Sequence, residues 1–419
     1  MDTKGDARVL RSVALRALLV AEVISTTGSQ MTWLALPWFV LITTGSPARM
    51  SFVVAAELGG YMLLGIPGGS AITRFGARRT MLFCDAMRGP LMLAIPLLHN
   101  AGLLSFWLLL LIAATEGALG APYGGAQRVL IPELLGESEA SVGRANALFQ
   151  GANRLPILAG PALAGVLISV IGATNVLVID ALTYAVAFAL VILFVPRTRP
   201  SVAGDDEADS AKGLWGGIRY IASDPVLRIW TIGLVFVDGC FQVVFLGLPV
   251  LVVAHYGSDP RLAGFLFGAW GAGAVLGNLL SYRYFSSQVR WSVVAPLVFI
   301  QALPLWVLTL PVASPFLIGA MALAGVLNGL SNPTFHALLT LRPPPQVRPK
   351  VVTTMFTASG LGGPFALLIA GPAFDALGVR TVLAIAAFGV TASLALEASA
   401  GFLTGSAVMP VSDPEENAA

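Results

Sequence analysis

The chain has 419 residues, of which 56% are hydrophobic and only 11% are charged, and its net charge is +2. Soluble domains carry about 25% charged residues, so a chain this long cannot cover itself with a polar surface in water. The composition therefore excludes an ordinary soluble protein, and the small net charge gives no reason to expect a nucleic-acid partner.

Apolar stretches near 20 residues long recur along the chain, and each is long enough to cross a hydrocarbon core of roughly 30 Å. Backbone polar groups need internal partners in lipid, which favours helices, and the runs are too long for barrel strands. We predict an all-α membrane protein with twelve transmembrane helices. The predicted spans are residues 14–42, 50–72, 80–99, 103–124, 143–171, 174–195, 226–254, 261–285, 291–311, 314–340, 350–374 and 379–404.

The two ends of the chain and one central segment are polar. The N-terminus carries Lys4, Arg8 and Arg11 and runs into a full-length span without a cleavage site, so we expect no signal peptide. The sequence predicts a six-helix half over residues 1–196, a linker over 197–225, and a second half with a short tail over 226–419.

Basic residues predict the orientation in the membrane. Of the 24 Lys and Arg residues, we count 19 in the N-terminus and alternate loops, two inside spans, and three (Arg49, Arg261 and Arg380) in the opposite loops. Loops rich in Lys and Arg stay on the cytoplasmic side. We therefore predict that both termini and the linker are cytoplasmic, in a bacterial cell (inner) membrane.

The two predicted halves repeat each other at a nearly constant offset. Leu15-Arg16 recurs as Leu227-Arg228 and Leu36-Pro37 as Leu248-Pro249, both 212 residues apart; Ala159–Ala162 recurs as Ala370–Ala373, 211 residues apart. Parallel repeats of this kind are the plan of one large class of secondary transporters.

The chain resembles the major facilitator superfamily, and most closely its bacterial macrolide, enterobactin and multidrug exporters. The resemblance covers nearly the whole chain. Its clearest parts are Leu36-Pro37-Trp38, the segment Gly69–Arg79, Ile131–Leu135, and Arg144–Ala147 leading to Gly160-Pro161-x-x-x-Gly165. It implies a transporter that works by alternating access, not an enzyme.

The segment after span 2 is similar to the family's loop motif. Gly69, Arg74, Gly76 and Arg78 match that motif, whereas Thr73 replaces its acidic residue. The resemblance implies a role in conformational cycling, and the alternative is a short basic turn whose glycines allow tight packing. Asp85 and Arg88, one turn apart in span 3, are candidates to replace the missing charge contact.

Gly160, Pro161 and Gly165 in span 5 are similar to an exporter motif. Small residues let helix backbones approach closely in lipid, and proline removes a backbone donor. Such a helix can bend or slide during transport, although a passive packing kink is the alternative. Two other family features are absent, because Ala113 and Ser29 replace an arginine and an aspartate.

Several charged residues lie inside the predicted spans, where an ionisable group at the bilayer centre costs about 2.5–3.5 kcal/mol. A carboxyl group among apolar helices favours its neutral form, so such groups can carry protons. The candidates for proton coupling are Asp238, Glu22, Glu116 and Glu57. We expect Arg154 to pair with Glu22 or Glu116, and Asp180, near an outer helix end, to be solvated.

Helical spacing places polar and aromatic residues on common faces. In the family that the chain resembles, spans 1 and 7 line a central cavity. The candidates for contact with substrate are Gln30, Trp33, Gln242, Arg154, Phe241 and Asn328. The mixture of aromatic and apolar residues with few charges suits hydrophobic or amphipathic cargo.

The favoured interpretation is a monomeric, proton-driven exporter of small amphipathic molecules. The alternatives are an importer of one defined solute and a non-transporting receptor or assembly factor on the same fold. The chain has three histidines, far apart in sequence, and no nucleotide-binding loop. We therefore expect no metal, no cofactor and no ATP hydrolysis.

Overall fold

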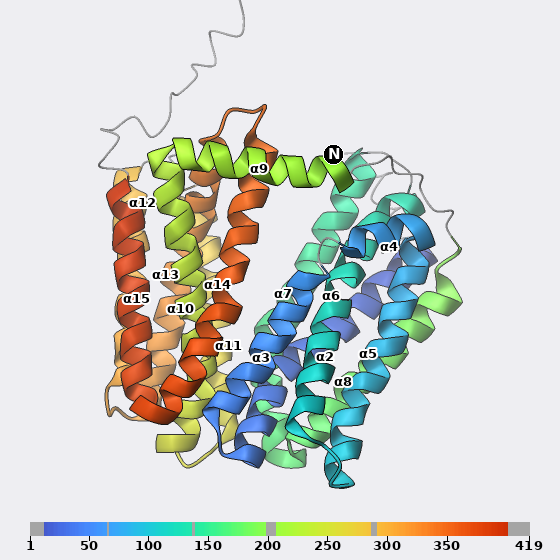
Figure 1. Ribbon diagram of the computed structural model, residues 1–419, viewed down its shortest axis with the longest axis horizontal. Coiled ribbons are helices and arrows are strands. Elements are labelled where there is room, and N and C mark those ends of the chain that lie inside the picture. Colours follow the sequence, from blue (N-terminus) through green and yellow to red (C-terminus); the bar gives the residue numbers. More distant parts are fainter. Residues whose placement is uncertain (1–11, 65–66, 136–138, 198–206, 286–290, 401–419) are drawn as a thin grey trace, which may run out of the picture. The chain divides into compact units, whose positions relative to one another are not determined.

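The computed structural model describes residues 12–64, 67–135, 139–197, 207–285 and 291–400, and every regular element within these ranges is a helix (Figure 1). The predicted all-α membrane fold is confirmed. The helices that precede the linker are α2 (Val13–Thr44), α3 (Pro47–Leu63), α4 (Pro67–Phe75), α5 (Ala77–Asn100), α6 (Phe106–Leu135), α7 (Glu139–Ile171) and α8 (Ala173–Phe194). The later helices are α9 (Glu207–Ser223), α10 (Pro225–His255), α11 (Pro260–Phe285), α12 (Trp291–Ile300), η1 (Leu303–Thr309), α13 (Ser314–Leu341), α14 (Arg348–Leu377) and α15 (Val379–Ala400).

Fewer helices than twelve meet the length and apolarity needed to cross a membrane. Within the described ranges there are nine, or ten if α3 and α4, bent by 52° from each other, form one span. Helix α2 is polar in its middle, where Ser, Thr and Gln occupy much of the segment 25–30. The predicted ninth span is divided between short α12 and the 3-10 helix η1. The count of twelve therefore stays a prediction.

Two segments predicted to be loop or linker contain helices. Residues 67–75 form α4, so the turn of the loop motif is confined to Gly76. Gly76 has φ +85°, a conformation that glycine adopts without steric cost. The predicted linker contains α9, which runs crosswise at one end of its unit (Figure 1).

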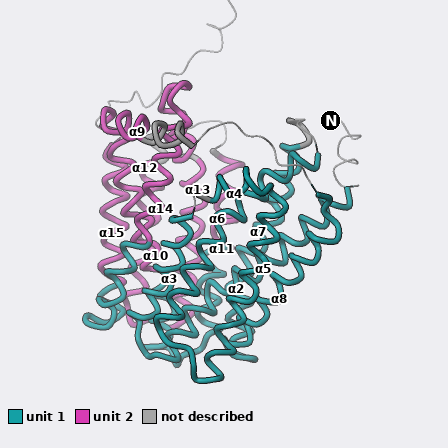
Figure 2. Tube along the Cα trace, turned by 45° about the vertical axis from the view of Figure 1, so that its right-hand side comes forward, with its two compact units in different colours: residues 1–206, 245–271, 364–382 teal, residues 207–244, 272–363, 383–419 magenta. Residues whose placement is uncertain are grey.

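The chain divides into two compact units (Figure 2). Unit 1 comprises Met1–Asp206, Phe245–Gly271 and Pro364–Val382, and unit 2 comprises Glu207–Val244, Ala272–Gly363 and Leu383–Ala419. These boundaries cross α10, α11, α14 and α15, whereas the sequence repeat divides the chain at its linker. The division into two six-helix halves therefore stays a prediction.

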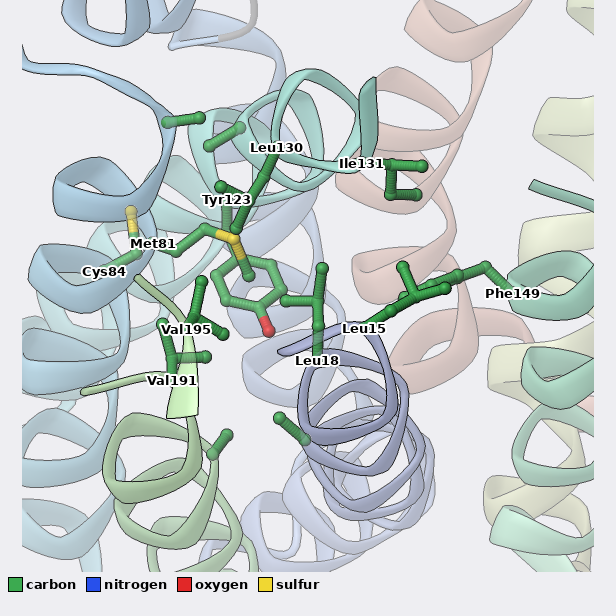
Figure 3. Close-up of a cluster of buried hydrophobic side chains, with 14 of the residues drawn as sticks. Leu15, Leu18, Met81, Cys84, Tyr123, Leu130, Ile131, Phe149, Val191 and Val195 are labelled. Carbon is green, nitrogen blue, oxygen red and sulfur yellow. The ribbon is translucent and has the colours of Figure 1, made fainter. Parts of the chain in front are cut away.

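In unit 1, α2 packs against α7 and α8, α3 against α6, and α5 against α6 and α8. Apolar side chains from α2, α5, α6, α7 and α8 meet around Tyr123, as Figure 3 shows. Arg78, at the start of α5, donates to the carbonyls of Ile192 and Val195 at the end of α8, over 2.9 and 2.8 Å. A cation at a helix C-terminus satisfies carbonyls that lack partners within the helix.

In unit 2, Trp230 of α10 ties that helix to α15 and α13. Its indole N–H donates to the carbonyl of Glu397 over 3.2 Å, and its ring meets the Phe335 ring edge-on. Asp224 accepts from the backbone N–H groups of Val226 and Leu227 as the cap of α10.

Candidate functional site

The site with the densest buried charge lies in unit 1, around Arg88 of α5. The Nε of Arg88 donates to Oε1 of Glu116 on α6 over 2.7 Å, and the two side chains are only 12% and 4% exposed. The guanidinium carbon lies 4.4 Å from the ring centroid of Tyr184 on α8 and 6.0 Å from that of Tyr123. This is a buried, charge-assisted pair with aromatic faces around the cation.

Glu22 on α2 forms a second part of this network. It accepts hydrogen bonds from Asn153 Nδ2 on α7 over 3.0 Å, from Thr26 Oγ1 over 3.2 Å, and from the Tyr123 hydroxyl over 3.5 Å. The expected partner Arg154 is exposed and takes no part. The prediction that Arg154 pairs with Glu22 or Glu116 is therefore wrong, because Asn153 and Arg88 occupy those positions.

Asp180 of α8 is fully buried, which corrects the expectation that it is solvated. Its carboxylate accepts hydrogen bonds from Thr32 over 2.6 Å and from Thr183 over 3.2 Å. Gly28 lies directly against it, leaving no room for a larger side chain. Nearby, Ser29 shares a hydrogen bond of 2.9 Å with the Tyr184 hydroxyl, which joins α2 to α8.

Two further carboxyl groups differ in their surroundings. Asp85 of α5 is 2% exposed, and neither of its oxygens has a hydrogen-bond partner among the described residues. Glu57 of α3 is half-buried, and its backbone carbonyl lies against Gly117 of α6. Asp85 also forms no ion pair with Arg88 or Arg74 within the described residues. In this state it therefore does not replace the acidic residue that the loop motif lacks at Thr73.

Unit 2 arranges its acidic groups differently. Glu397 of α15 is 2% exposed and lies against Gly233, and its Oε1 has no partner among the described residues. Asp238 of α10 is exposed. The prediction that Asp238 carries a proton stays a prediction.

The candidates for substrate contact fall in different places. Gln30 is half-buried on α2, and its Cβ is the nearest neighbour of Gly160 on α7. Trp33, Gln242 and Phe241 are also half-buried. Asn328 donates to Gln301 over 3.2 Å and accepts from Asn332, in unit 2. Their role in binding stays a prediction.

The motif glycines of α7 lie at two helix contacts within unit 1. A Cβ on Gly160 would meet Gln30 Cβ at 2.5 Å, and one on Gly165 would meet the Pro260 carbonyl of α11 at 2.5 Å. A Cβ added to Gly371 of α14 would likewise meet the Ser51 Cβ of α3 at 2.7 Å. Both glycine-proline segments of the sequence repeat thus serve close helix approach.

The loop-motif residues contact no carboxylate among the described residues. Gly69 and Arg74 are exposed, the latter 5.5 Å from the Phe75 ring centroid. Thr73, in the position of the acidic residue, donates to the Ser70 carbonyl. Their role in conformational cycling stays a prediction.

The polar partners of the buried charges, chiefly Tyr184, Tyr123 and Asn153, were not singled out from the sequence. These side chains are uncharged, so their residue type alone did not mark them as partners of an ion. The spacing of Asp180 and Tyr184 could have predicted that the two side chains lie on one face, because residues four apart share a helix face.

The fold and the site define a helical membrane protein with a buried ion pair and close helix contacts at glycine. The model of the Major Facilitator Superfamily matches residues 18–367. The chain therefore belongs to this superfamily, a family of transporters that move small molecules across a lipid bilayer.

Two relatives share most of their length with the chain. The multidrug efflux pump Tap of Mycobacterium bovis is 26% identical over 382 residues, covering 88% of this chain and 89% of the pump. The multidrug efflux pump Tap of Mycolicibacterium fortuitum is 25% identical over 387 residues, covering 88% and 92%.

Solved structures show the same fold at low identity. The chain is similar to a bacterial homologue of the lysosomal transporter Spinster, with a TM-score of 0.70, 14% identity, and 94% and 97% of the two chains covered. It is also similar to the nucleoside transporter NupG, with a TM-score of 0.72, 11% identity, and 92% and 99% covered.

Proposed function

We propose that this transporter exports hydrophobic or amphipathic small molecules in exchange for protons. The observation that carries this proposal is the set of buried carboxyl groups around one cation in unit 1. Glu22, Glu116, Asp85 and Asp180 are each at most 7% exposed, and Arg88, which pairs with Glu116, is the cation buried in this site. One positive charge cannot balance four ionised carboxylates in a site of low dielectric, so some of them must hold protons.

The direction of transport is proposed from the relatives. Similarity over 88% of the chain to two multidrug efflux pumps favours export over import. Apolar cargo is favoured by two half-buried aromatic side chains, Trp33 and Phe241. It is also favoured by the small number of exposed charges inside the helices. We further propose that the transporter works as a monomer.

Alternating access is supported by the contacts inside unit 1. Near one set of helix ends, α7 packs on α11 through Gly165 and Gly264, and α3 packs on α14 through Ser51 and Gly371. Hydrogen bonds from Arg261 to Ser169 (2.7 Å) and from Ser46 to Asp375 (3.2 Å) join the same helix pairs. We infer that these contacts close the outer side and must separate when the transporter opens outward.

The test is transport by the purified protein in lipid vesicles. Ethidium, an apolar cation, is the probe, and its movement is followed by fluorescence while a pH gradient is imposed in either direction. The proposal expects ethidium to move against the proton flow and the rate to vanish when the gradient is collapsed. Glu116→Gln and Glu22→Gln should impair coupling, whereas Glu57→Gln, which has no ionic partner among the described residues, should do less.

Two results would contradict the proposal. Ethidium movement that is indifferent to the pH gradient would exclude proton coupling for this probe, and movement in the same direction as the protons would indicate import. Repeating the assay with a nucleoside in place of ethidium separates an importer of a defined solute from an exporter of apolar cations.

The cytoplasmic orientation of both termini rests on the distribution of basic residues. It is tested with Ala208→Cys in a chain whose Cys84 and Cys240 are replaced by serine. A membrane-impermeant maleimide added to intact cells should leave position 208 unlabelled, and it should label that position once the cells are opened.

A further inference from the structure

We propose that Asp85 carries an exchangeable proton and that Arg88 pairs alternately with Glu116 and Asp85. In the present state Arg88 pairs with Glu116 and Asp85 is neutral. The inference rests on the proposed proton coupling and names a residue that the sequence placed only in the conformational motif.

Asp85 is buried without a hydrogen-bond partner among the described residues. Its side chain is 2% exposed, and neither oxygen has a hydrogen-bond partner among the described residues. Met81 and Cys84, which precede it on α5, lie in the apolar cluster around Tyr123 (Figure 3). An ionised carboxylate without a partner costs several kcal/mol in such surroundings, whereas a neutral carboxyl group costs far less. Asp85 is therefore protonated in this state.

A set of charged and polar groups faces Asp85. They are Arg88 on its own helix, Glu22 on α2, and Glu116 and Tyr123 on α6. Arg88 is the one cation among them, and two of the others are carboxyl groups. An additional negative charge at Asp85 is favourable only when Arg88 turns toward it.

Asp85 and Arg88 lie close enough on α5 for direct contact. Asp85 and Arg88 are three residues apart on α5, a spacing that places their Cβ atoms about 5–6 Å apart on one face. The guanidinium that now reaches Glu116 on α6 over 2.7 Å can reach Asp85 by a change of rotamer. Glu116 already has one oxygen, Oε2, without a partner among the described residues, so it accommodates a proton when Arg88 leaves.

The exchange balances in protons and charge. Asp85 releases its proton to water as Arg88 turns toward it, and Glu116 takes up a proton as it loses Arg88. One ion pair and one neutral carboxyl group exist before and after. The Arg88–Glu116 ion pair joins α5 to α6 only while Asp85 is protonated. The protonation state of Asp85 is therefore linked to the packing of these two helices.

The test reads protonation directly and needs no substrate. Infrared spectra of the purified protein in lipid vesicles at neutral pH show the C=O stretch of neutral carboxyl groups. Asp85→Asn should remove one such band, and Asp85→Glu should restore a band at a shifted position. Glu116→Gln frees Arg88 to ionise Asp85, so the Asp85 band should also be lost. Asp259→Asn, at an exposed position, is the control and should leave the band in place.

The outcomes separate this inference from the proposed function. An unchanged band in Asp85→Asn would show that Asp85 is ionised, and an unchanged band in Glu116→Gln would show that the two acids do not compete for Arg88; either result overturns the inference. If the bands behave as expected but wild-type ethidium transport ignores the pH gradient, the proposed function fails alone. If wild-type transport is proton-driven and Asp85→Asn transports equally well, the inference fails alone.

Discussion

The buried charges of unit 1 and unit 2 differ although the sequence repeats between the two halves of the chain. In unit 1 an arginine lies deep among helices and pairs with Glu116. In unit 2 the ion pair of the described residues is at helix ends, where Arg342 meets the cap residue Asp224 over 3.0 Å and both side chains are 18% exposed. A buried pair responds to protonation and helix movement, whereas an exposed pair contributes little. We therefore propose that the charge-dependent step of the transport cycle involves the buried pair of unit 1.

The largest effect on stability is expected when Arg88 is replaced. Arg88→Gln leaves Glu116 without its partner in a buried site, and the loss of one member of a buried pair costs about 3–5 kcal/mol. The free energy of unfolding in a detergent titration should fall accordingly. The double variant Arg88→Gln with Glu116→Gln should recover part of the loss, because no unpaired charge remains. An equal loss in the double variant would show that the pair does not contribute as a unit.

The glycine contact of α7 gives the next largest effect. Gly165→Ala places a methyl group against the Pro260 carbonyl and should cost about 1–3 kcal/mol through overpacking. Because the contact closes one side in the proposed cycle, this variant should also slow ethidium transport. Gly151→Ala on the same helix is the matched control, since nothing lies within 4 Å of its added Cβ. Similar behaviour of the two variants would remove Gly165 from the mechanism.

The loop motif should give an effect on stability of similar size. Gly76→Ala forces a non-glycine residue into φ +85°, which costs about 1–3 kcal/mol for residues held in such conformations. Gly59→Ala is the control, because Gly59 lies outside the motif in helix α3 and its added Cβ would meet open space. Transport should fall in Gly76→Ala while ethidium binding, measured by fluorescence anisotropy, is unchanged. Weakened binding would place this turn in the substrate site instead.

The smallest effect on stability is expected at Asp238 in unit 2. Asp238 is exposed, so Asp238→Asn should change the free energy of unfolding by less than about 0.5 kcal/mol. Transport decides its role: a stable Asp238→Asn protein that binds ethidium but no longer couples to the pH gradient would assign a proton to unit 2 as well. Normal coupling in this variant would confine the charge-dependent step to unit 1.

The sequence alone determined the solvent of this protein and the type of its elements. A composition with 11% charged residues favours a bilayer, where helices or closed barrels are stable, and the long apolar stretches favour helices. It also placed Glu22, Glu116 and Arg88 inside helical spans, because charged residues within apolar stretches stand out by type. The glycines of α7 were recognisable for a similar reason, since small residues at a fixed spacing mark close helix contacts.

The tertiary structure decided which of these groups meet. Sequence periodicity fixes the face of a helix on which a side chain lies, but not the helix that packs against that face. The partner of Glu116 is therefore Arg88 of α5 and not Arg154 of α7, and Asp180 is buried against Gly28 instead of solvated. A hydrogen-bonded ion pair forms only when its two groups are in direct contact, so the chemistry of the site depended on helix packing that the sequence pattern does not encode.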